Sequence, residues 1–403
     1  MSAAKKKVSR GASPGRRRAA KAAPPAQKVG LVLPGGGARA AYQVGVLKGL
    51  AELLPQDSPT PFPVVSGTSA GAINAALIAS HAHNFRAGVA YLDHVWREIH
   101  CDKVFKTDAL TVLKTSLHWV FTLMTGGMDR HNPISLLDNA PLRTLLEEHI
   151  AFERLEECID ANVLDALAIT TSGYTSARSI TFYQGRKGLK PWHRTRRLGQ
   201  PVDIELNHIM ASVALPVIFP AVRIGREYFG DGSLRQSAPL SPVLHLGADK
   251  VLVITLRNEQ PNPLPLEQEA VPYPSLGQIA GYLLDTLFMD SIYGDLERLQ
   301  RINNTVSRIK GKAGQDQPLK VVDTLVITPS EDMRDIAQRH KHEFPRSVRL
   351  LLRGVGGMHR SGSQLLSYLL FESGYCRDLI DMGVRDARAQ ADKLLEFIGA
   401  PSP

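Results

Sequence analysis

The sequence has few cysteines, which excludes a disulfide framework and a cysteine-based metal site. Its 403 residues include three cysteines, which are odd in number and far apart: Cys101, Cys158 and Cys376. Such a set is typical of a protein in a reducing compartment. Two close histidine pairs exist, but residues two positions apart do not share a helix face (His81 and His83, His340 and His342). The sequence therefore predicts no metal and no other cofactor.

Long apolar runs are also lacking. No run reaches the roughly 20 residues that a membrane-spanning helix needs. The most apolar stretch, residues 110–124, is shorter and ends at two glycines. It is typical of a core helix, or of a lid or membrane-contacting element that could hold an acyl chain beside an active site.

Acidic residues are missing from residues 1–28, which hold nine Lys or Arg among many Ala and Pro. Because the whole chain has a net charge of +9, residues 29–403 sum to zero, which argues against specific nucleic-acid binding by the main body. The basic stretch lacks the apolar core of a secretion signal and predicts a disordered tail. Its functional alternative is contact with a polyanion such as anionic lipid headgroups. We therefore expect a cytoplasmic protein. Peripheral contact with a membrane through the tail and residues 110–124 is one option. The sequence does not indicate an oligomeric state.

What is present is a repeated order of strand, glycine turn and helix. A short apolar strand at 29–33 precedes a glycine-rich turn and a helix at 40–50, and a strand at 64–66 precedes a second turn and a helix at 72–79. This order predicts parallel strands with a right-handed crossover. Both turns then lie at the carboxyl edge of one sheet, where α/β folds place their sites.

The second turn carries the pattern G-x-S-x-G, with Ser69 at its tip: Gly67, Thr68, Ser69, Ala70 and Gly71. Small neighbours let a serine occupy a strained turn that exposes its hydroxyl at a helix N-terminus. The alternative is a tight turn whose serine only caps the helix. The strand-turn-helix context favours a nucleophile.

The first turn contains consecutive glycines: Gly35, Gly36, Gly37, Ala38 and Arg39. It lacks the P-loop pattern and matches the dinucleotide-binding pattern poorly, so a phosphate site is the weaker reading. Consecutive glycines also let several N–H groups point into one space, as in an oxyanion hole, where each donor contributes about 3 to 4 kcal/mol to the transition state. Beside a nucleophile turn, the oxyanion hole is the stronger reading, with a plain turn as the alternative.

The remaining elements are predicted more coarsely. Strands are expected at 163–171, 179–183, 251–255 and 321–327, and a hairpin at 223–233 that ends in Asp231-Gly232. A basic loop is expected at 185–197 and a proline-rich loop at 259–274. Helices are expected at 141–150, at 276–303 and over most of 361–398, the last with breaks near Gly374 and Gly383.

Three of these stretches stand in an order that resembles the patatin-like phospholipase family: the glycine turn at 35–39, the serine turn at 67–71, and Asp231-Gly232. The resemblance implies a three-layer α/β/α fold with a mostly parallel sheet and a Ser-Asp dyad without a catalytic histidine. By position, Ser69 would be the nucleophile and Asp231 the base, with the oxyanion hole at residues 35–39. Ala40 and Ser233 depart from the family pattern, but both are small and neither is the assigned nucleophile or base.

The sequence thus predicts a serine acyl hydrolase of lipid esters, with a basic tail at 1–28, a catalytic core at 29–256 and a mainly helical extension at 257–403. Acyl transfer and thioester hydrolysis would use the same dyad. A Ser-His-Asp triad with His208 or His245 is a rival that fits the motif order poorly. A non-catalytic protein that binds membranes or polyanions through the tail is the rival of another class.

Overall fold

The computed structural model describes residues 27–108, 135–258, 273–308 and 319–400. Three regions singled out in the sequence lie wholly or mostly outside the described residues: the basic tail 1–28, the apolar segment 110–124 and the loop 259–274. Within the described part of the chain, no helix is both long enough and apolar enough to cross a bilayer.

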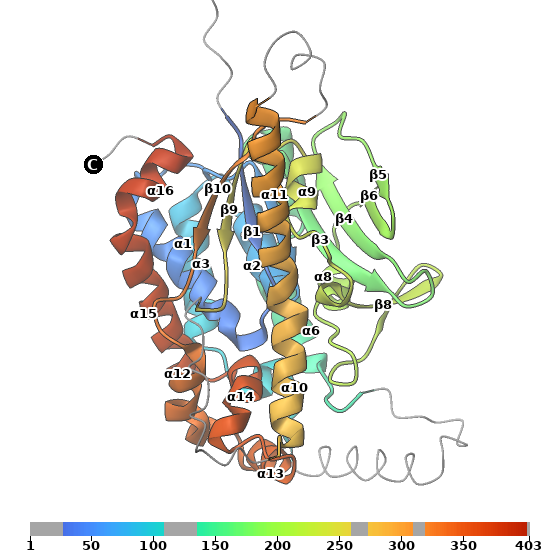
Figure 1. Cartoon of the computed structure of the whole chain (residues 1–403), viewed down its shortest axis with the longest axis vertical. Coiled ribbons are helices and arrows are strands. Elements are labelled where there is room, and N and C mark those ends of the chain that lie inside the picture. The colour runs from blue at the N-terminus through green and yellow to red at the C-terminus, as the bar shows by residue number, and fades with distance from the viewer. Residues whose placement is uncertain (1–26, 109–134, 259–272, 309–318, 401–403) are drawn as a thin grey trace, which may run out of the picture.

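The fold is organised around one ten-stranded sheet, eight of whose strands follow the order β10-β9-β1-β2-β3-β4-β6-β5 (Figure 1). Neighbouring strands are parallel throughout the run β10, β9, β1, β2 and β3, whereas β4 pairs antiparallel to β3. A hairpin of β7 and β8 joins the end of β3. The strands are β1 (Val29–Leu33), β2 (Val64–Thr68), β3 (Ala166–Gly173), β4 (Ser179–Gly185), β5 (Trp192–Arg194), β6 (Arg197–Pro201), β7 (Val222–Ile224), β8 (Glu227–Asp231), β9 (Lys250–Ile254) and β10 (Asp323–Ile327).

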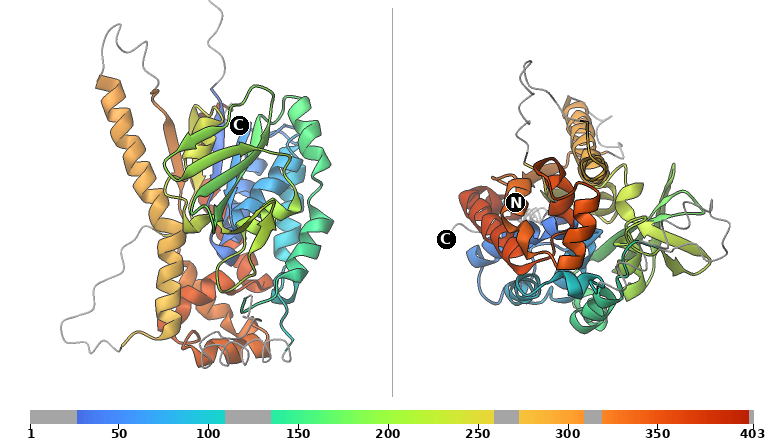
Figure 2. Two further views of the ribbon diagram at one scale, coloured as in Figure 1. Left: turned by 90° about the vertical axis from the view of Figure 1, so that its right-hand side faces the viewer. Right: turned by 90° about the horizontal axis from the view of Figure 1, so that it is seen from below.

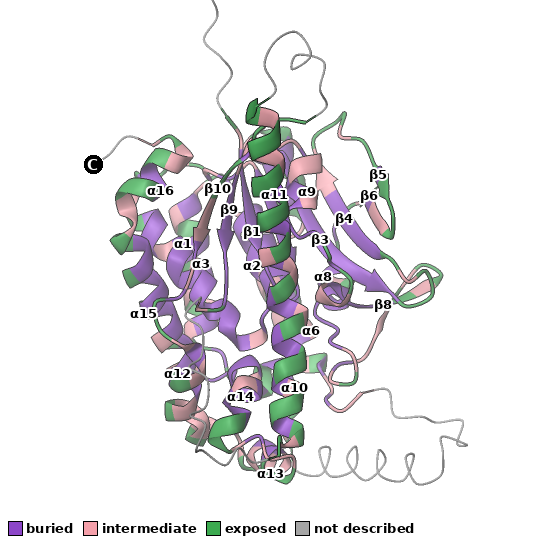
Figure 3. Cartoon of the chain, in the orientation of Figure 1, coloured by how far each residue is buried: buried purple, intermediate pink, exposed green. Residues whose placement is uncertain are grey.

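Helices cover both faces of the sheet, which explains why β1 and β2 are buried without alternation (Figures 1 and 3). Leu31 and Leu33 of β1 face a core built with α1 (Ala41–Leu53), α2 (Ala70–Ser80), α3 (Phe85–Arg97) and α15 (Ser373–Ala389). Val32 faces the opposite core, built with α9 (Ser241–His245) and α11 (Ser291–Arg308). The predicted layered α/β fold with a mostly parallel sheet is confirmed.

The remaining helices frame the ends of these layers. They are α4 (Cys101–Val104), α6 (Ala140–His149), α7 (Glu153–Asp160), α8 (Leu206–Ser212), α10 (Leu276–Asp285), α12 (Met333–His340), α13 (Arg346–Gly354), α14 (Ser363–Leu369) and α16 (Ala391–Ile398). Single 3₁₀ turns form η1 (Gly37–Ala40), η2 (Gly232–Leu234), η5 (Lys341–Glu343) and η6 (Arg360–Gly362).

One long helical rod runs along the molecule and confirms the helix expected at 276–303 (Figure 2). It consists of α10, a π-helical turn η3 (Thr286–Asp290) and α11, and it extends to Arg308. A π-turn inside a helix often marks a functional region. Here it turns Phe288 and Met289 into the protein, where both are buried.

Two local predictions were wrong. The expected basic loop at 185–197 forms β5 and the start of β6, because Trp192 is buried between Tyr183, at 5.2 Å between ring centroids, and His245, at 4.8 Å. The break expected near Gly383 is absent, since α15 runs unbroken from Ser373 to Ala389. A Cβ on Gly383 would lie 2.5 Å from the Tyr42 carbonyl oxygen, so this glycine serves the close packing of α15 on α1.

The chain beyond residue 256 belongs to the same cores and sheet as the chain before it. β10 pairs with β9 in a parallel register, and α15 packs along α1. The boundary predicted at residue 256 stays a prediction. All three cysteines are buried and form no disulfide.

Candidate active site

Ser69 occupies a strained turn between β2 and α2. Its φ of 54° and ψ of −132° lie outside the regions that residues with a Cβ usually adopt. A Cβ on Gly71 would collide with the Leu33 carbonyl oxygen, so the turn tolerates no larger residue there. The Ser69 N–H donates to Ser212 Oγ at 2.9 Å, and that hydroxyl donates to the Thr170 carbonyl at 2.7 Å. The strain is therefore held in place by α8 and β3.

The glycine turn passes directly beside Ser69. A Cβ added to Gly35 would lie 2.8 Å from Ser69 Cβ. Gly37 has a φ of 54°, and a Cβ there would collide with the Tyr368 carbonyl oxygen. Gly37 and Ala38 begin η1, and the first N–H groups of a helix have no partner within it. The turn thus presents backbone donors near Ser69.

Asp231 reaches the same place through the register of the sheet. Thr68 pairs with Thr170 of β3, and Asp231 of β8 pairs with the next residue, Thr171. β8 pairs with β3 directly beyond the point where β2 stops pairing with it. Asp231 and Ser69 therefore meet although they are 162 positions apart in the sequence. The predicted nucleophile and base are therefore brought together by the fold.

The Asp231 carboxyl group is fully buried, with one oxygen held and the other unpaired. Its Oδ1 accepts a 2.9 Å hydrogen bond from the Ser233 N–H, and its own N–H donates to the Ala214 carbonyl at 2.8 Å. Among the described residues, Oδ2 has no hydrogen-bond partner of normal geometry. Burial raises the pKa of Asp231 to about 6, while the nearby Ser69 hydroxyl and Ser233 partly oppose the rise. Catalytic hydrogen bonds are often loose without substrate, so this geometry fits a base waiting for a proton.

A narrow apolar cavity of about 60 Å³ opens beside Ser69. Its walls come from both halves of the chain, between α2, α3, α6 and the segment from η3 to α14. They are mainly aliphatic and aromatic: Ile73, Leu77, Val95, Trp96, Ile99, Val104, Leu142, Leu145, Leu146, Val213, Leu215, Phe219, Phe288, Leu369 and Phe371. Such a lining suits an apolar group such as part of an acyl chain.

Comparison with known proteins agrees with this geometry. The sequence model of the family described as "Patatin-like phospholipase" matches residues 31–244, which is more than half of the chain. The chain belongs to the patatin-like phospholipase family. The match runs from β1 to α9 and includes the glycine turn, the serine turn and Asp231-Gly232. None of the curated proteins compared with the chain matches it.

Membership of the patatin-like phospholipases confirms the resemblance seen in the sequence and makes the chain a lipid acyl hydrolase that acts on lipid substrates. The family does not by itself assign roles to individual residues of this chain.

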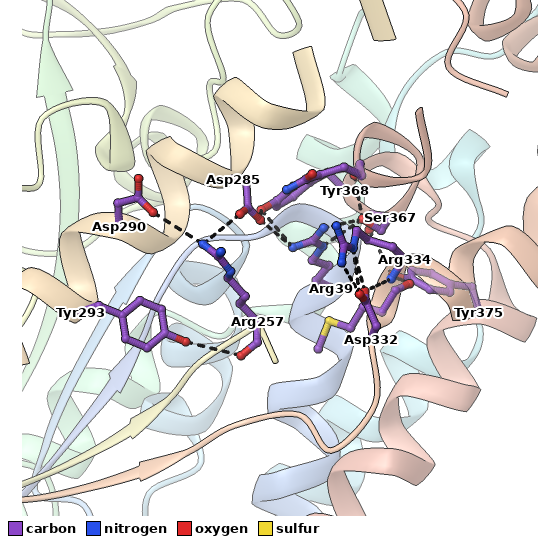
Figure 4. A network of polar contacts seen from close by, with 12 residues as sticks. Arg39, Arg257, Asp285, Asp290, Tyr293, Asp332, Arg334, Ser367, Tyr368 and Tyr375 are labelled. Carbon is purple, nitrogen blue, oxygen red and sulfur yellow. Dashed lines mark hydrogen bonds and ion pairs between the residues drawn. The ribbon is translucent and has the colours of Figure 1, made fainter. Parts of the chain in front are cut away.

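The Arg39 side chain of this patatin-like phospholipase points into a network of polar contacts with Asp285, Ser367 and Tyr368 (Figure 4). Its guanidinium is buried and donates from Nε and Nη2 to Ser367 Oγ, at 2.9 and 2.7 Å. Nη1 donates to Asp285 Oδ1 at 3.2 Å and to the Tyr368 hydroxyl at 3.1 Å. The Arg39 N–H donates to the Gly36 carbonyl at 3.1 Å. Arg39 thus ties the glycine turn to α10 and α14, and its own N–H is paired within the turn.

The network around Arg39 was missed by sequence reasoning. Asp285 also forms ion pairs with Arg257 at 3.2 Å, and its Oδ1 accepts from the Tyr368 hydroxyl at 3.0 Å. The partners lie 246 to 329 residues from Arg39 in the sequence, outside the family match, and carry no recognisable motif. The local signal in the sequence is that Asp285 directly follows a stretch, 273–284, without any Asp, Glu, Lys or Arg.

Neither histidine of the rival triad is among the residues that line the cavity beside Ser69. His208 Nδ1 accepts from the Glu205 N–H at 3.0 Å, and its ring packs edge-on against Phe182 at 4.7 Å. His245 stacks on Trp192. Burial lowers the pKa of both imidazoles. In the described part of the chain, no group of three or more His, Cys, Asp or Glu is arranged to hold a metal ion.

Proposed function

We propose that the chain hydrolyses lipid esters through a dyad of Ser69 and Asp231. Ser69 Oγ attacks the ester carbonyl while Asp231 Oδ2 takes its proton, and the carbonyl oxygen becomes an oxyanion that the Gly36, Gly37 and Ala38 amides bind. Collapse of this intermediate expels the alcohol, which takes the proton back from Asp231. A water that Asp231 deprotonates then attacks the acyl-enzyme, the bond between Ser69 Oγ and the acyl carbon breaks to release the carboxylic acid, and Ser69 Oγ takes the proton back from Asp231.

One observation carries this proposal: a strained, cavity-lining serine stands next to a buried carboxylate, and its hydroxyl lowers the pKa of that carboxylate, whose second oxygen has no hydrogen-bond partner of normal geometry among the described residues. A buried carboxylate that only supported the fold would have both oxygens paired, since an unpaired buried oxygen costs free energy. Here the pKa of about 6 keeps Asp231 ionised at neutral pH but ready to accept a proton.

The cavity supports an acyl chain as the part of the substrate that enters the protein. Each methylene group that moves from water into this apolar lining makes binding more favourable by about 0.8 kcal/mol. As part of the same proposal, the buried free cysteines favour a reducing compartment such as the cytoplasm, and the basic tail favours peripheral contact with membrane lipid.

A fluorophosphonate probe tests the nucleophile. The probe should label the wild-type chain at Ser69, and Ser69→Ala should lose both the label and ester hydrolysis. Ser361→Ala, at an exposed serine, is the matched control and should keep both. A label at any other residue would overturn the assignment.

A second pair of variants separates the dyad from a triad. Asp231→Asn should reduce hydrolysis at least a thousandfold because the amide cannot take the proton. Variants His208→Gln and His245→Gln should retain hydrolysis. Full activity in Asp231→Asn would contradict the dyad. Product analysis with water as the only acceptor separates hydrolysis from acyl transfer.

A further inference from the structure

The two sides of α10 are both apolar, but only one is covered. On the inner side, the Gly277 N–H donates to the Val355 carbonyl at 2.7 Å, and a Cβ on Gly281 would lie 2.7 Å from the Leu365 nitrogen. The outer side, together with Tyr273 three positions before the helix, is exposed: Tyr273 by 92%, Leu276 by 69%, Ile279 by 39%, Tyr282 by 68% and Leu283 by 56%.

This outer side differs from an ordinary solvated helix face. No Asp, Glu, Lys or Arg occurs from Tyr273 to Leu284. A surface helix normally carries charged residues opposite its buried side. A contiguous exposed apolar face of this kind marks an interaction site.

A cationic stretch lies next to this apolar side, where the Gly277 N–H meets the Val355 carbonyl. The neighbouring stretch 341–360, which includes α13, holds five Lys or Arg and one acid, Glu343, and its Leu350 is 72% exposed. The ion pairs found among the described residues involve none of these five cations: Lys341, Arg346, Arg349, Arg353 and Arg360. The stretch therefore adds a charge of +4 beside the apolar face.

The position of this surface relates it to the candidate active site. α10 and α13 lie together at the lower end of the molecule in Figure 1, and both views of Figure 2 agree. The rod continues from Leu283 to Phe288, which lines the cavity beside Ser69. At 1.5 Å per residue, these two side chains are about 8 Å apart along the axis.

We propose that the outer side of α10 together with α13, called here the α10–α13 surface, docks on an anionic lipid bilayer. Its purpose, delivery of substrate to the cavity, rests on the proposed function. The apolar side chains enter the boundary between headgroups and acyl chains, and the arginines contact anionic headgroups. A second copy of the chain fits this surface poorly, because a two-fold interface would bring two such cationic stretches together.

Cysteine labelling tests the contact directly, because all three native cysteines are buried. The full chain with Leu276→Cys carries an environment-sensitive fluorophore, and Leu319→Cys, 52% exposed in the wild type, is the control. Vesicles of phosphatidylcholine and phosphatidylglycerol in equal parts should shift the label at position 276 to the blue and leave that at 319 unchanged. An unshifted label at 276 under conditions where the protein binds vesicles overturns the proposal.

Vesicle partitioning supplies the second measurement. Leu276→Gln with Leu283→Gln, and separately Arg346→Gln with Arg353→Gln, should each weaken binding about tenfold or more. Matched pairs, Leu319→Gln with Val321→Gln and Arg301→Gln with Arg308→Gln, should bind as the wild type does. Unchanged binding in both test pairs would show that the surface has another occupant than lipid. If the protein is a dimer and the leucine pair makes it monomeric, that occupant is a second copy of the chain.

Failure of this proposal is distinguishable from failure of the proposed function. The leucine and arginine pairs should hydrolyse a water-soluble short-chain ester like the wild type when vesicles are absent. Ser69→Ala should lose hydrolysis and keep vesicle binding. Hydrolysis by Ser69→Ala would refute the dyad alone, whereas wild-type binding by both surface pairs would refute the docking surface alone.

Discussion

At the scale of single residues, the most informative group is the Asp231 carboxyl. Burial pushes its pKa up to about 6, and only the Ser69 hydroxyl and Ser233 oppose that effect. The carboxylate must be ionised to accept a proton from Ser69. We therefore expect kcat/KM for a soluble short-chain ester to rise about tenfold per pH unit below pH 6 and to level off above it. A flat profile from pH 5 to pH 8 would show that no group with this pKa acts as the base.

The same raised pKa predicts a cost in stability. A carboxyl group whose pKa is higher in the folded state than its ordinary value of 3.8 favours folding when protonated, and that advantage is lost as pH rises through about 6. At pH 8 the ionised group should destabilise the fold by about 3 kcal/mol, and at pH 4 by little. Asp231→Asn should therefore raise the unfolding temperature at pH 8 but hardly at pH 4. Thermal scans at both pH values check this, with Asp57→Asn, at an exposed aspartate, as the control.

At the scale of elements, Arg39 joins η1 to α10 and α14. Lysine keeps the charge but cannot reach Ser367 and Asp285 at once, because it lacks the planar fork of arginine. We expect Arg39→Lys to lower the free energy of unfolding by about 2 kcal/mol. Because the glycine turn loosens, kcat should fall more than tenfold while KM changes little.

The control for this variant is Arg257→Lys, which alters a partly exposed partner of the same Asp285. Its effect on unfolding should stay below about 1 kcal/mol, because exposed ion pairs contribute little. Equal losses in the two variants, or a loss in stability without a loss in kcat, would contradict the role of Arg39 as the anchor of the turn.

Elements whose signal is local were predictable from the sequence, and those defined by distant contacts were not. A pattern within a few residues was enough to predict four elements: the strand before Pro34, the strand before Ser69, the serine turn and the rod from Leu276. β5 depends on Trp192 stacking against His245, which lies 53 positions away. The Arg39 network depends on Asp285 and Ser367, which no local pattern connects to a glycine turn.

At the scale of the whole molecule, the candidate site is completed by the chain outside the family match. Phe288 and Phe371 line the cavity, and Asp285 holds Arg39. The Leu240 N–H, within the match, donates to Asp295 Oδ2 of the rod at 3.0 Å. The catalytic core predicted at 29–256 therefore lacks part of its own cavity and of both hydrophobic cores when taken alone.

We accordingly expect a chain that ends at residue 256 to lose soluble-ester hydrolysis and to unfold without cooperativity. Without β10 and α15, the edge of β9 and the buried side of α1 would be exposed to water. Removal of residues 1–26 is the matched deletion, and because β1 begins at Val29 it should leave hydrolysis and cooperative unfolding unchanged. Circular dichroism melting and ester turnover measure both effects. A cooperative, active chain that ends at residue 256 would show that the predicted core is an independent domain and that the later helices serve another purpose.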